Sequence, residues 1–148
     1  MAHNTKLLPL TEEQQRFIEN NVLIIRTMVE SLTEEGSPDS TLPWTHPERL
    51  DAAYGAWYAE HNRVEEDPAP MLTAFGVGFG EYLIAEFNLK WAFANDKKGN
   101  GLVLTGMPGK LLLFPDRLLQ KHYDRGDLCF FSTLAARYSK LLARINGL

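Results

Sequence analysis

The stretch from residue 76 to residue 115 constrains the fold more than any other part of the chain. It opens with a glycine-rich apolar segment, GVGFGEYLIAEF, and continues into an alternating segment that carries a tryptophan, LKWAFAND. A polar glycine turn, KKGNG, separates this segment from two more short apolar runs, the last of which ends at Phe114–Pro115. A long helix followed by short strands and tight turns is typical of an α+β domain.

The short apolar runs predict a sheet of three strands in an antiparallel meander, over residues 90–95, 102–105 and 110–114. In the first strand Trp91 and Phe93 alternate with Ala92 and Ala94, so the two pairs lie on opposite faces. The turns GNG and GMPG carry the glycine and proline expected between strands. Because three strands need an apolar face covered, we expect helices from both ends of the chain to pack on this sheet.

Apolar periodicity and capping residues predict about five helices around the sheet. The predicted ranges are residues 12–32, about 46–63, 69–88, 115–123 and the segment after 127. Two helices open at capping boxes, Thr11 with Gln14 and Thr45 with Glu48. Asp127 is the predicted cap of the last helix.

The predicted apolar faces hold one amide and two glycines. In the first helix Asn21 lies among apolar positions, and we expect its amide to be buried and satisfied by a neighbouring backbone group. The other apolar positions on that face are Phe17, Ile18, Val22, Ile24, Ile25, Met28, Val29 and Leu32. In the third helix Gly76 and Gly80 lie four residues apart, which predicts close packing of a neighbouring element.

Size and composition favour a single domain over residues 1–148, with residues 1–10 as a loose lead-in. The hydrophobic fraction is 45% and the charged fraction is 23%, as in ordinary globular proteins. The net charge of −4 argues against a nucleic-acid partner. We expect no membrane span, because no apolar run approaches about 20 residues. One cysteine, Cys129, fits a reducing compartment, so the cytoplasm is the expected location.

Recognisable catalytic and cofactor motifs are absent from the sequence. GVGFG lies within a predicted helix and follows no strand, so it is not read as a dinucleotide-binding loop. The four histidines are scattered, which predicts neither a metal site nor a cofactor. Cys129 is interpreted as an incidental thiol. The best catalytic candidate is Glu86, a carboxylate on the apolar arc of its helix, acting as an acid or base with His122 or Arg117.

Aromatic residues before and within the second helix predict a surface for a protein partner. Tyr54, Tyr58 and His61 form a stripe beside the face of Trp57, which we expect in the core. Tyr and Trp favour such a role because they combine a large contact area with a polar group. The predicted contact residues are Trp44, Tyr54, Tyr58, His61 and Glu86. The alternative is that these residues form the rim of an ordinary core.

Residues of about 70–128 also resemble a bacterial family of uncharacterised small domains. The resemblance rests on the helical glycines of GVGFG, the strand tryptophan, the strand ending in Phe-Pro and the basic helix of LLLFPDRLLQKHYDRGD. Asp127 stands where the family pattern leads us to expect glutamate, a departure that affects only a helix cap. The resemblance implies a small α+β fold without an established activity, and it assigns no functional residue.

The leading hypothesis is therefore a non-catalytic protein-binding domain. Its narrower form is a bacterial immunity protein that neutralises a cognate toxin by direct contact, an analogy based on class and not on fold. Two alternatives stay open. One is a small enzyme that uses Glu86, and the other is a structural or regulatory homodimer in which the LLLF segment at 111–114 extends a sheet across the interface.

Overall fold

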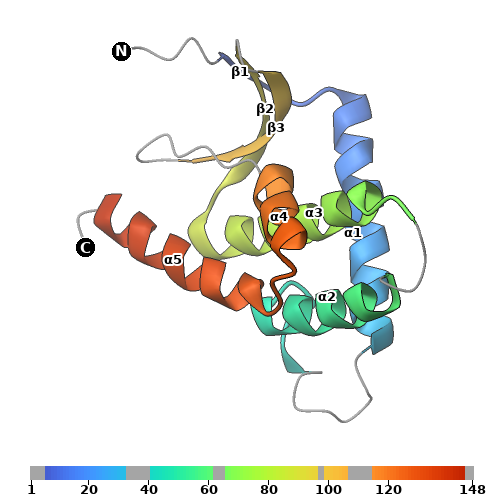
Figure 1. Ribbon diagram of the computed structural model, residues 1–148. Helices are drawn as coiled ribbons and strands as arrows, with labels where there is room; N and C mark the ends of the chain where they lie inside the picture. The colour runs from blue at the N-terminus through green and yellow to red at the C-terminus, as the bar shows by residue number, and fades with distance from the viewer. Residues whose placement is uncertain (1–5, 33–40, 62–65, 97–98, 107–114, 146–148) are drawn as a thin grey trace.

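The structure, a computed structural model, describes residues 6–32, 41–61, 66–96, 99–106 and 115–145. In chain order its elements are β1 (Lys6–Leu8), α1 (Glu12–Leu32), α2 (Pro47–His61), α3 (Ala69–Phe87), β2 (Lys90–Asp96), β3 (Gly99–Thr105), α4 (Pro115–Arg125) and α5 (Phe130–Ile145). The predicted α+β class is confirmed, with a small sheet at one end of a group of five helices among these residues (Figure 1).

Helix α1 begins at the predicted capping box. The Thr11 N–H donates to Gln14 Oε1 at 2.9 Å, and the Gln14 N–H donates to Thr11 Oγ1 at 3.1 Å. Two backbone donors that a helix start leaves unpaired are thereby satisfied. The prediction for Asn21 is also confirmed, because its buried amide donates from Nδ2 to the Phe17 carbonyl at 2.9 Å.

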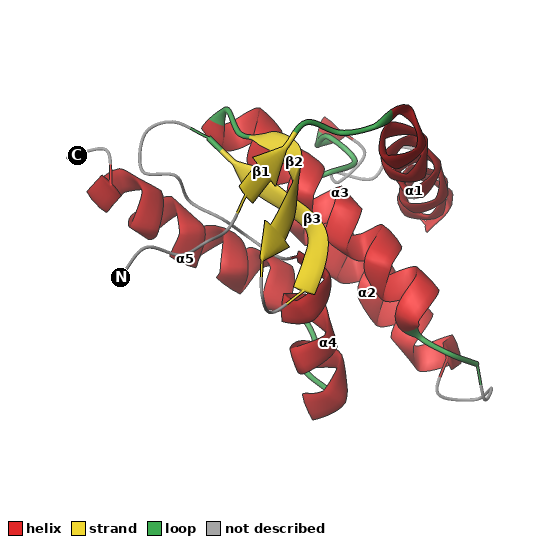
Figure 2. Ribbon diagram, turned by 90° about the horizontal axis from the view of Figure 1, so that it is seen from above, coloured by secondary structure: helices red, strands yellow, loops and turns green. Residues whose placement is uncertain are grey.

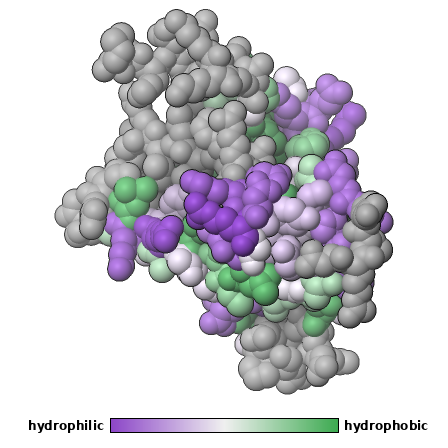
Figure 3. Space-filling view, viewed as in Figure 1, coloured by the Kyte–Doolittle hydropathy of each residue, from purple (hydrophilic) through white to green (hydrophobic). Residues whose placement is uncertain are grey.

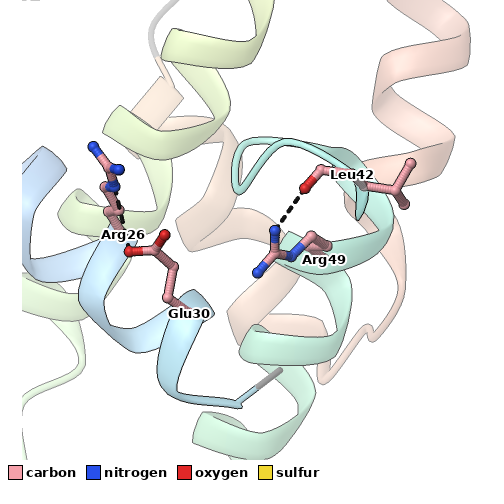
Figure 4. Close-up of polar contacts among 4 residues, drawn as sticks. All are labelled: Arg26, Glu30, Leu42 and Arg49. Carbon is pink, nitrogen blue, oxygen red and sulfur yellow. Dashed lines mark hydrogen bonds and ion pairs between the residues drawn. The ribbon is translucent and has the colours of Figure 1, made fainter. Parts of the chain in front are cut away.

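Helix α2 begins one residue later than its predicted capping box requires. Pro47 is the first helical residue, so His46, and not Thr45, takes the N-cap position. The ring Nδ1 of His46 accepts from the Glu48 N–H at 3.2 Å, which replaces the predicted Thr45–Glu48 exchange. The buried Arg49 ties the preceding segment to the helix, because its Nη1 donates to the Leu42 carbonyl at 2.6 Å (Figure 4).

Helix α3 is the centre of the fold and contacts each of the other four helices. Its glycines allow these contacts to be close. A Cβ on Gly78 would lie 3.2 Å from Ile25 of α1, and a Cβ on Gly80 would overlap the ring of Trp91 in β2. The prediction that Gly80 is a packing glycine is confirmed. The helix ends at Phe87 and is capped by Asn88, which adopts a left-handed conformation (φ 56°) and turns the chain into β2.

The sheet is antiparallel with the order β1-β2-β3 (Figure 2). Strands β2 and β3 form the predicted hairpin, with Trp91 opposite Leu104 and Phe93 opposite Leu102. The outer strand β1 comes from the N-terminal segment, where a loose lead-in was expected, and Leu8 lies opposite Phe93. The predicted third strand at 110–114, and with it the proposed sheet extension by LLLF, lies outside the described residues.

The core lies where α2, α3 and α5 meet, and it is rich in aromatic side chains. Tyr54 is fully buried at its centre, with its ring centroid 5.3 Å from that of Phe75 and 4.8 Å from that of Phe130. Phe131 of α5 contacts Phe79 of α3 at a centroid distance of 5.5 Å. A second, small buried group of Ala92, Ala94 and Val103 lies on the opposite face of the sheet from Trp91 and Phe93.

The α4–α5 junction corrects the predicted cap of the last helix. Helix α4 extends to Arg125 and closes through Gly126 (φ 72°), after which the Asp127 N–H donates to the His122 carbonyl at 3.0 Å. The Asp127 carboxylate lies 2.9 Å from His122 Nδ1. Since α5 begins only at Phe130, Asp127 belongs to the end of α4 and does not cap α5.

Candidate functional site: an apolar groove beside helix α1

A groove lies between α1, α3 and one face of the sheet. Its volume is about 300 Å³, at the lower end of the range for ligand sites in proteins. The described lining residues come from four elements, α1, α3, β2 and β3. They are Gln14, Phe17, Thr73, Gly76, Val77, Trp91, Phe93, Gly101 and Leu102.

Helix α1 forms one wall of the groove with Gln14 and Phe17. The capping box fixes the first turn of α1 and with it the position of Gln14, and Phe17 follows one turn later. Phe17 is 46% exposed although it lies on the predicted core face, so the expectation that it is buried is wrong. The core lies one residue further round the helix, at Ile18, Asn21 and Ile25.

The opposite wall depends on the position of Trp91. Its indole Nε1–H donates to Glu81 Oε2 on α3 at 2.8 Å, and the ring lies against Gly80. These two contacts fix both the tilt and the depth of the ring. Trp91 is half-buried and lines the groove. The sequence predicted the packing role of Gly80 but not that it places an aromatic wall.

The sheet contributes a row of apolar side chains to the same surface. Leu8, Phe93 and Leu102 lie opposite one another on β1, β2 and β3, so they share one face of the sheet. Phe93 and Leu102 line the groove, and Leu8 at the end of the row is 44% exposed. Apolar surface therefore continues from the groove to the edge of the sheet.

The lining that the structure describes is apolar and uncharged. Its nine residues carry no side chain that ionises, so these residues supply neither an acid nor a base. Aromatic and aliphatic groups dominate, and the polar side chains are the amide of Gln14 and the hydroxyl of Thr73. Such a lining favours an uncharged group that leaves water for an apolar surface.

The predicted aromatic stripe on α2 is largely a packing surface. Tyr54 is 0% exposed, so the prediction that it faces a partner is wrong. Trp57, predicted in the core, is half-buried, as are Tyr58 and Trp44, and all three pack against the core cluster. A contact role for the exposed parts of Trp44 and Tyr58 stays a prediction.

His61 is also buried, at 7% exposure. Its ring stacks on Trp57 with a centroid distance of 4.8 Å, and its Nε2 lies 2.9 Å from the hydroxyl of Tyr123 on α4. Tyr58 contacts the same tyrosine edge-on at 5.8 Å. The structure thus brings Tyr58 and His61 together at the α2–α4 contact, whereas Tyr54 lies in the core against Phe75 and Phe130. Tyr123, which the sequence did not single out, is the residue that joins them.

The candidate acid Glu86 lies elsewhere. It is exposed near the end of α3, so the prediction that it occupies the apolar arc is wrong. Its neighbour is Tyr82, whose pKa is raised by burial and, to a smaller extent, by the charge of Glu86. Its expected partner His122 contacts Asp127 instead, and the side chain of Arg117 lies outside the described part of the structure.

Within the described ranges, no three or more His, Cys, Asp or Glu residues gather where a metal ion could be held. No helix in the same ranges is both long and apolar enough to cross a membrane. Cys129 is exposed and has a left-handed backbone conformation (φ 58°) immediately before α5.

Comparison with known proteins extends these observations. Residues 56–131 match the model of a family described as Domain of unknown function (DUF3806). The matched range contains most of the groove lining, from Thr73 to Leu102, and the His61–Tyr123 contact. It does not include Gln14 and Phe17, the α1 wall. A search of curated proteins gave no match.

A crystal structure from Bacteroides thetaiotaomicron VPI-5482 has a similar fold. The TM-score is 0.61 at 13% sequence identity, over 87% of this chain and 45% of the other. This chain therefore spans less than half the length of that protein. At this identity the likeness concerns the fold alone.

Proposed function

We propose that this chain, which belongs to the DUF3806 family of domains of unknown function, has a non-catalytic binding function. In this proposal the groove holds an apolar side chain of a protein partner. The observation that carries the proposal is Phe17, a large aromatic residue that is 46% exposed at the mouth of an apolar groove. Covering the exposed half of this side chain contributes about 1 kcal/mol.

The apolar surface beyond the groove favours a polypeptide over a small molecule. Ile24 lies two helical turns beyond Phe17 on the same side of α1 and is 50% exposed. The two residues are about 10 Å apart along the helix axis. At the other end Leu8 is also exposed. A partner that follows this surface contacts all three residues, in the manner of a segment that packs along a helix and inserts one side chain into a groove.

Charge supports a basic partner. The chain carries a net charge of −4, which favours association with a positively charged protein. The face seen in Figure 3 is hydrophilic over its middle, where α4 lies, and its hydrophobic residues form small separate patches.

An immunity protein that neutralises a cognate toxin is the narrower form of this proposal, and a toxin gene next to the gene for this chain would support it.

A selection from a peptide library, followed by variants of α1, tests the proposed function. Peptides are selected on the wild-type protein from a random phage-displayed library, and their affinities are measured by calorimetry. Phe17→Asp should weaken the selected peptides by about tenfold or more, because the groove loses its apolar rim. Leu23→Asp is the matched control, since Leu23 is 65% exposed on α1 and does not line the groove.

Both variants should keep the wild-type circular dichroism spectrum, because the replaced side chains are exposed. A library that yields no binder, or binders that tolerate Phe17→Asp as well as Leu23→Asp, would contradict the proposed function.

A further inference from the structure

Some hydrogen-bonding groups of the groove residues already have a partner within the protein, and others do not. Gln14 Oε1 accepts from the Thr11 N–H, so the capping box sets the orientation of the amide. The Nε2 donor of Gln14 has no acceptor among the described residues. On the other wall the Trp91 indole N–H is already bound to Glu81. The groove therefore presents its aromatic surface together with the Gln14 Nε2 donor, which no described residue engages.

We infer that the side chain bound in this groove is a tyrosine of the partner. The inference rests on the proposed function and names the residue type that the groove takes. The phenol ring packs between Phe17, Trp91 and Phe93, and its hydroxyl oxygen accepts a hydrogen bond from Gln14 Nε2. The Thr73 hydroxyl also lines the groove and is the second polar group in it.

Other side chains match the groove less well. Phenylalanine fills the same space but leaves the Gln14 donor without an acceptor, which is unfavourable when water is excluded. The tryptophan indole carries a donor and no acceptor, so it duplicates the chemistry of Gln14. Lysine, arginine, aspartate and glutamate would enter a groove whose described lining residues offer no ionisable group to pair with them.

Three blocked amino acids serve as probes: N-acetyltyrosinamide, N-acetylphenylalaninamide and N-acetylleucinamide. Binding is followed by two-dimensional ¹H–¹⁵N NMR, in which the indole N–H signal of Trp91 reports on the groove wall. A Trp91→Phe sample assigns that signal among the three tryptophans. The tyrosine probe should move the Trp91 signal at the lowest concentration, followed by the phenylalanine probe and then the leucine probe.

Gln14→Glu isolates the proposed hydrogen bond. Glutamate keeps the capping box, because its carboxylate accepts from the Thr11 N–H as the amide oxygen does, but it removes the Nε2 donor. The affinity for the tyrosine probe should fall by about two- to tenfold, while that for the phenylalanine probe stays unchanged. Gln15→Glu is the control, as it makes the same charge change at an exposed neighbouring position outside the groove.

Each outcome bears on one of the two proposals. Equal affinities for the tyrosine and phenylalanine probes, or equal losses of both in Gln14→Glu, overturn the tyrosine assignment and leave the groove as a general apolar site. A leucine probe that binds best does the same. If no probe moves the Trp91 signal, the tyrosine assignment also fails. The peptide selection with Phe17→Asp then decides whether the proposed function fails with it.

Discussion

The Asp51 carboxylate, on α2, accepts hydrogen bonds from the backbone N–H of Ser132 at 3.2 Å and from its hydroxyl at 2.7 Å. It also accepts from the Phe131 N–H at 2.8 Å. These are the second and third residues of α5, whose N–H groups a local N-cap side chain would normally satisfy. The residue before α5 is Cys129, which is not one of the side chains that usually cap a helix. Asp51 of α2 takes this role instead.

Asp51→Ala should therefore destabilise the fold by about 1–2 kcal/mol. The variant removes the capping hydrogen bonds and the favourable interaction of a negative charge with the start of a helix. Urea denaturation followed by circular dichroism measures the effect. Glu60→Ala is the control, because Glu60 is exposed on the same helix, and its change should stay within about 0.5 kcal/mol. Equal stability of the two variants would mean that the cap has no energetic role.

Gly80→Ala should destabilise the protein, although alanine is the better helix former. Its Cβ would overlap the Trp91 ring, and the displacement should cost about 1–3 kcal/mol, more than the roughly 1 kcal/mol gained in helix propensity. The displaced indole should also lose its bond to Glu81 and show a shifted N–H signal. Gly55→Ala is the matched control. Its Cβ would meet no atom within 4 Å, so this variant should be stabilised. Two variants that change stability alike would contradict the packing role of Gly80.

Tyr54→Phe should leave the stability unchanged or raise it by up to about 1 kcal/mol. The Tyr54 hydroxyl is buried and has no hydrogen-bond partner among the described residues, so its removal takes away an unfavourable group. Tyr123→Phe provides the contrast, because it removes the contact with His61 and should cost about 0.5–1.5 kcal/mol. A larger loss for Tyr54→Phe than for Tyr123→Phe in thermal unfolding would refute this ranking.

Stability should fall as the pH rises above about 10. Burial, and then the neighbouring Tyr58, Tyr123 and Asp127, raise the pKa of Tyr54 above its usual value of 10.0. Burial is also the main cause of raised pKa values at Tyr82, Tyr123 and Tyr138. Above the ordinary tyrosine pKa of about 10, the unfolded chain loses its tyrosine hydroxyl protons while the folded protein still holds them, so the equilibrium shifts toward the unfolded state.

The urea midpoint of the wild type should accordingly be lower at about pH 10.5 than at about pH 8. Tyr54→Phe should show a smaller decrease, because one of the protonated hydroxyls is absent. A midpoint that stays constant over this range, or an identical decrease in both proteins, would contradict the assignment.

Local signals predicted the elements well. The Thr11–Gln14 box, the break before residue 69 and the alternation at Trp91–Phe93 each act within a few residues, and the helices and hairpin follow them. The family of unknown function was also anticipated in general terms. The motifs themselves remain interpretations, since the match to the family covers a range and not individual positions.

Local sequence patterns could not predict which distant segments contact each other, or which face of each helix is buried. On α2, Tyr54 and Trp57 belong to one broad aromatic arc, so periodicity does not tell which of them meets α5, and Tyr54 takes the core. In α1 the apolar arc is wider than the surface that its neighbours cover, which leaves Phe17 exposed. The capping of α5 by Asp51 joins residues 80 positions apart, beyond the reach of any local pattern.

The pairing of β1 with β2 has a consequence for synthesis on the ribosome. Leu8 lies opposite Phe93, so 85 residues must be added before the first strand finds its partner. At 5–20 residues per second this takes roughly 4–17 s. During that interval α1 emerges with its apolar side chains uncovered, since α3 is still being made. Protection of the nascent N-terminal segment by chaperones would therefore cover this interval.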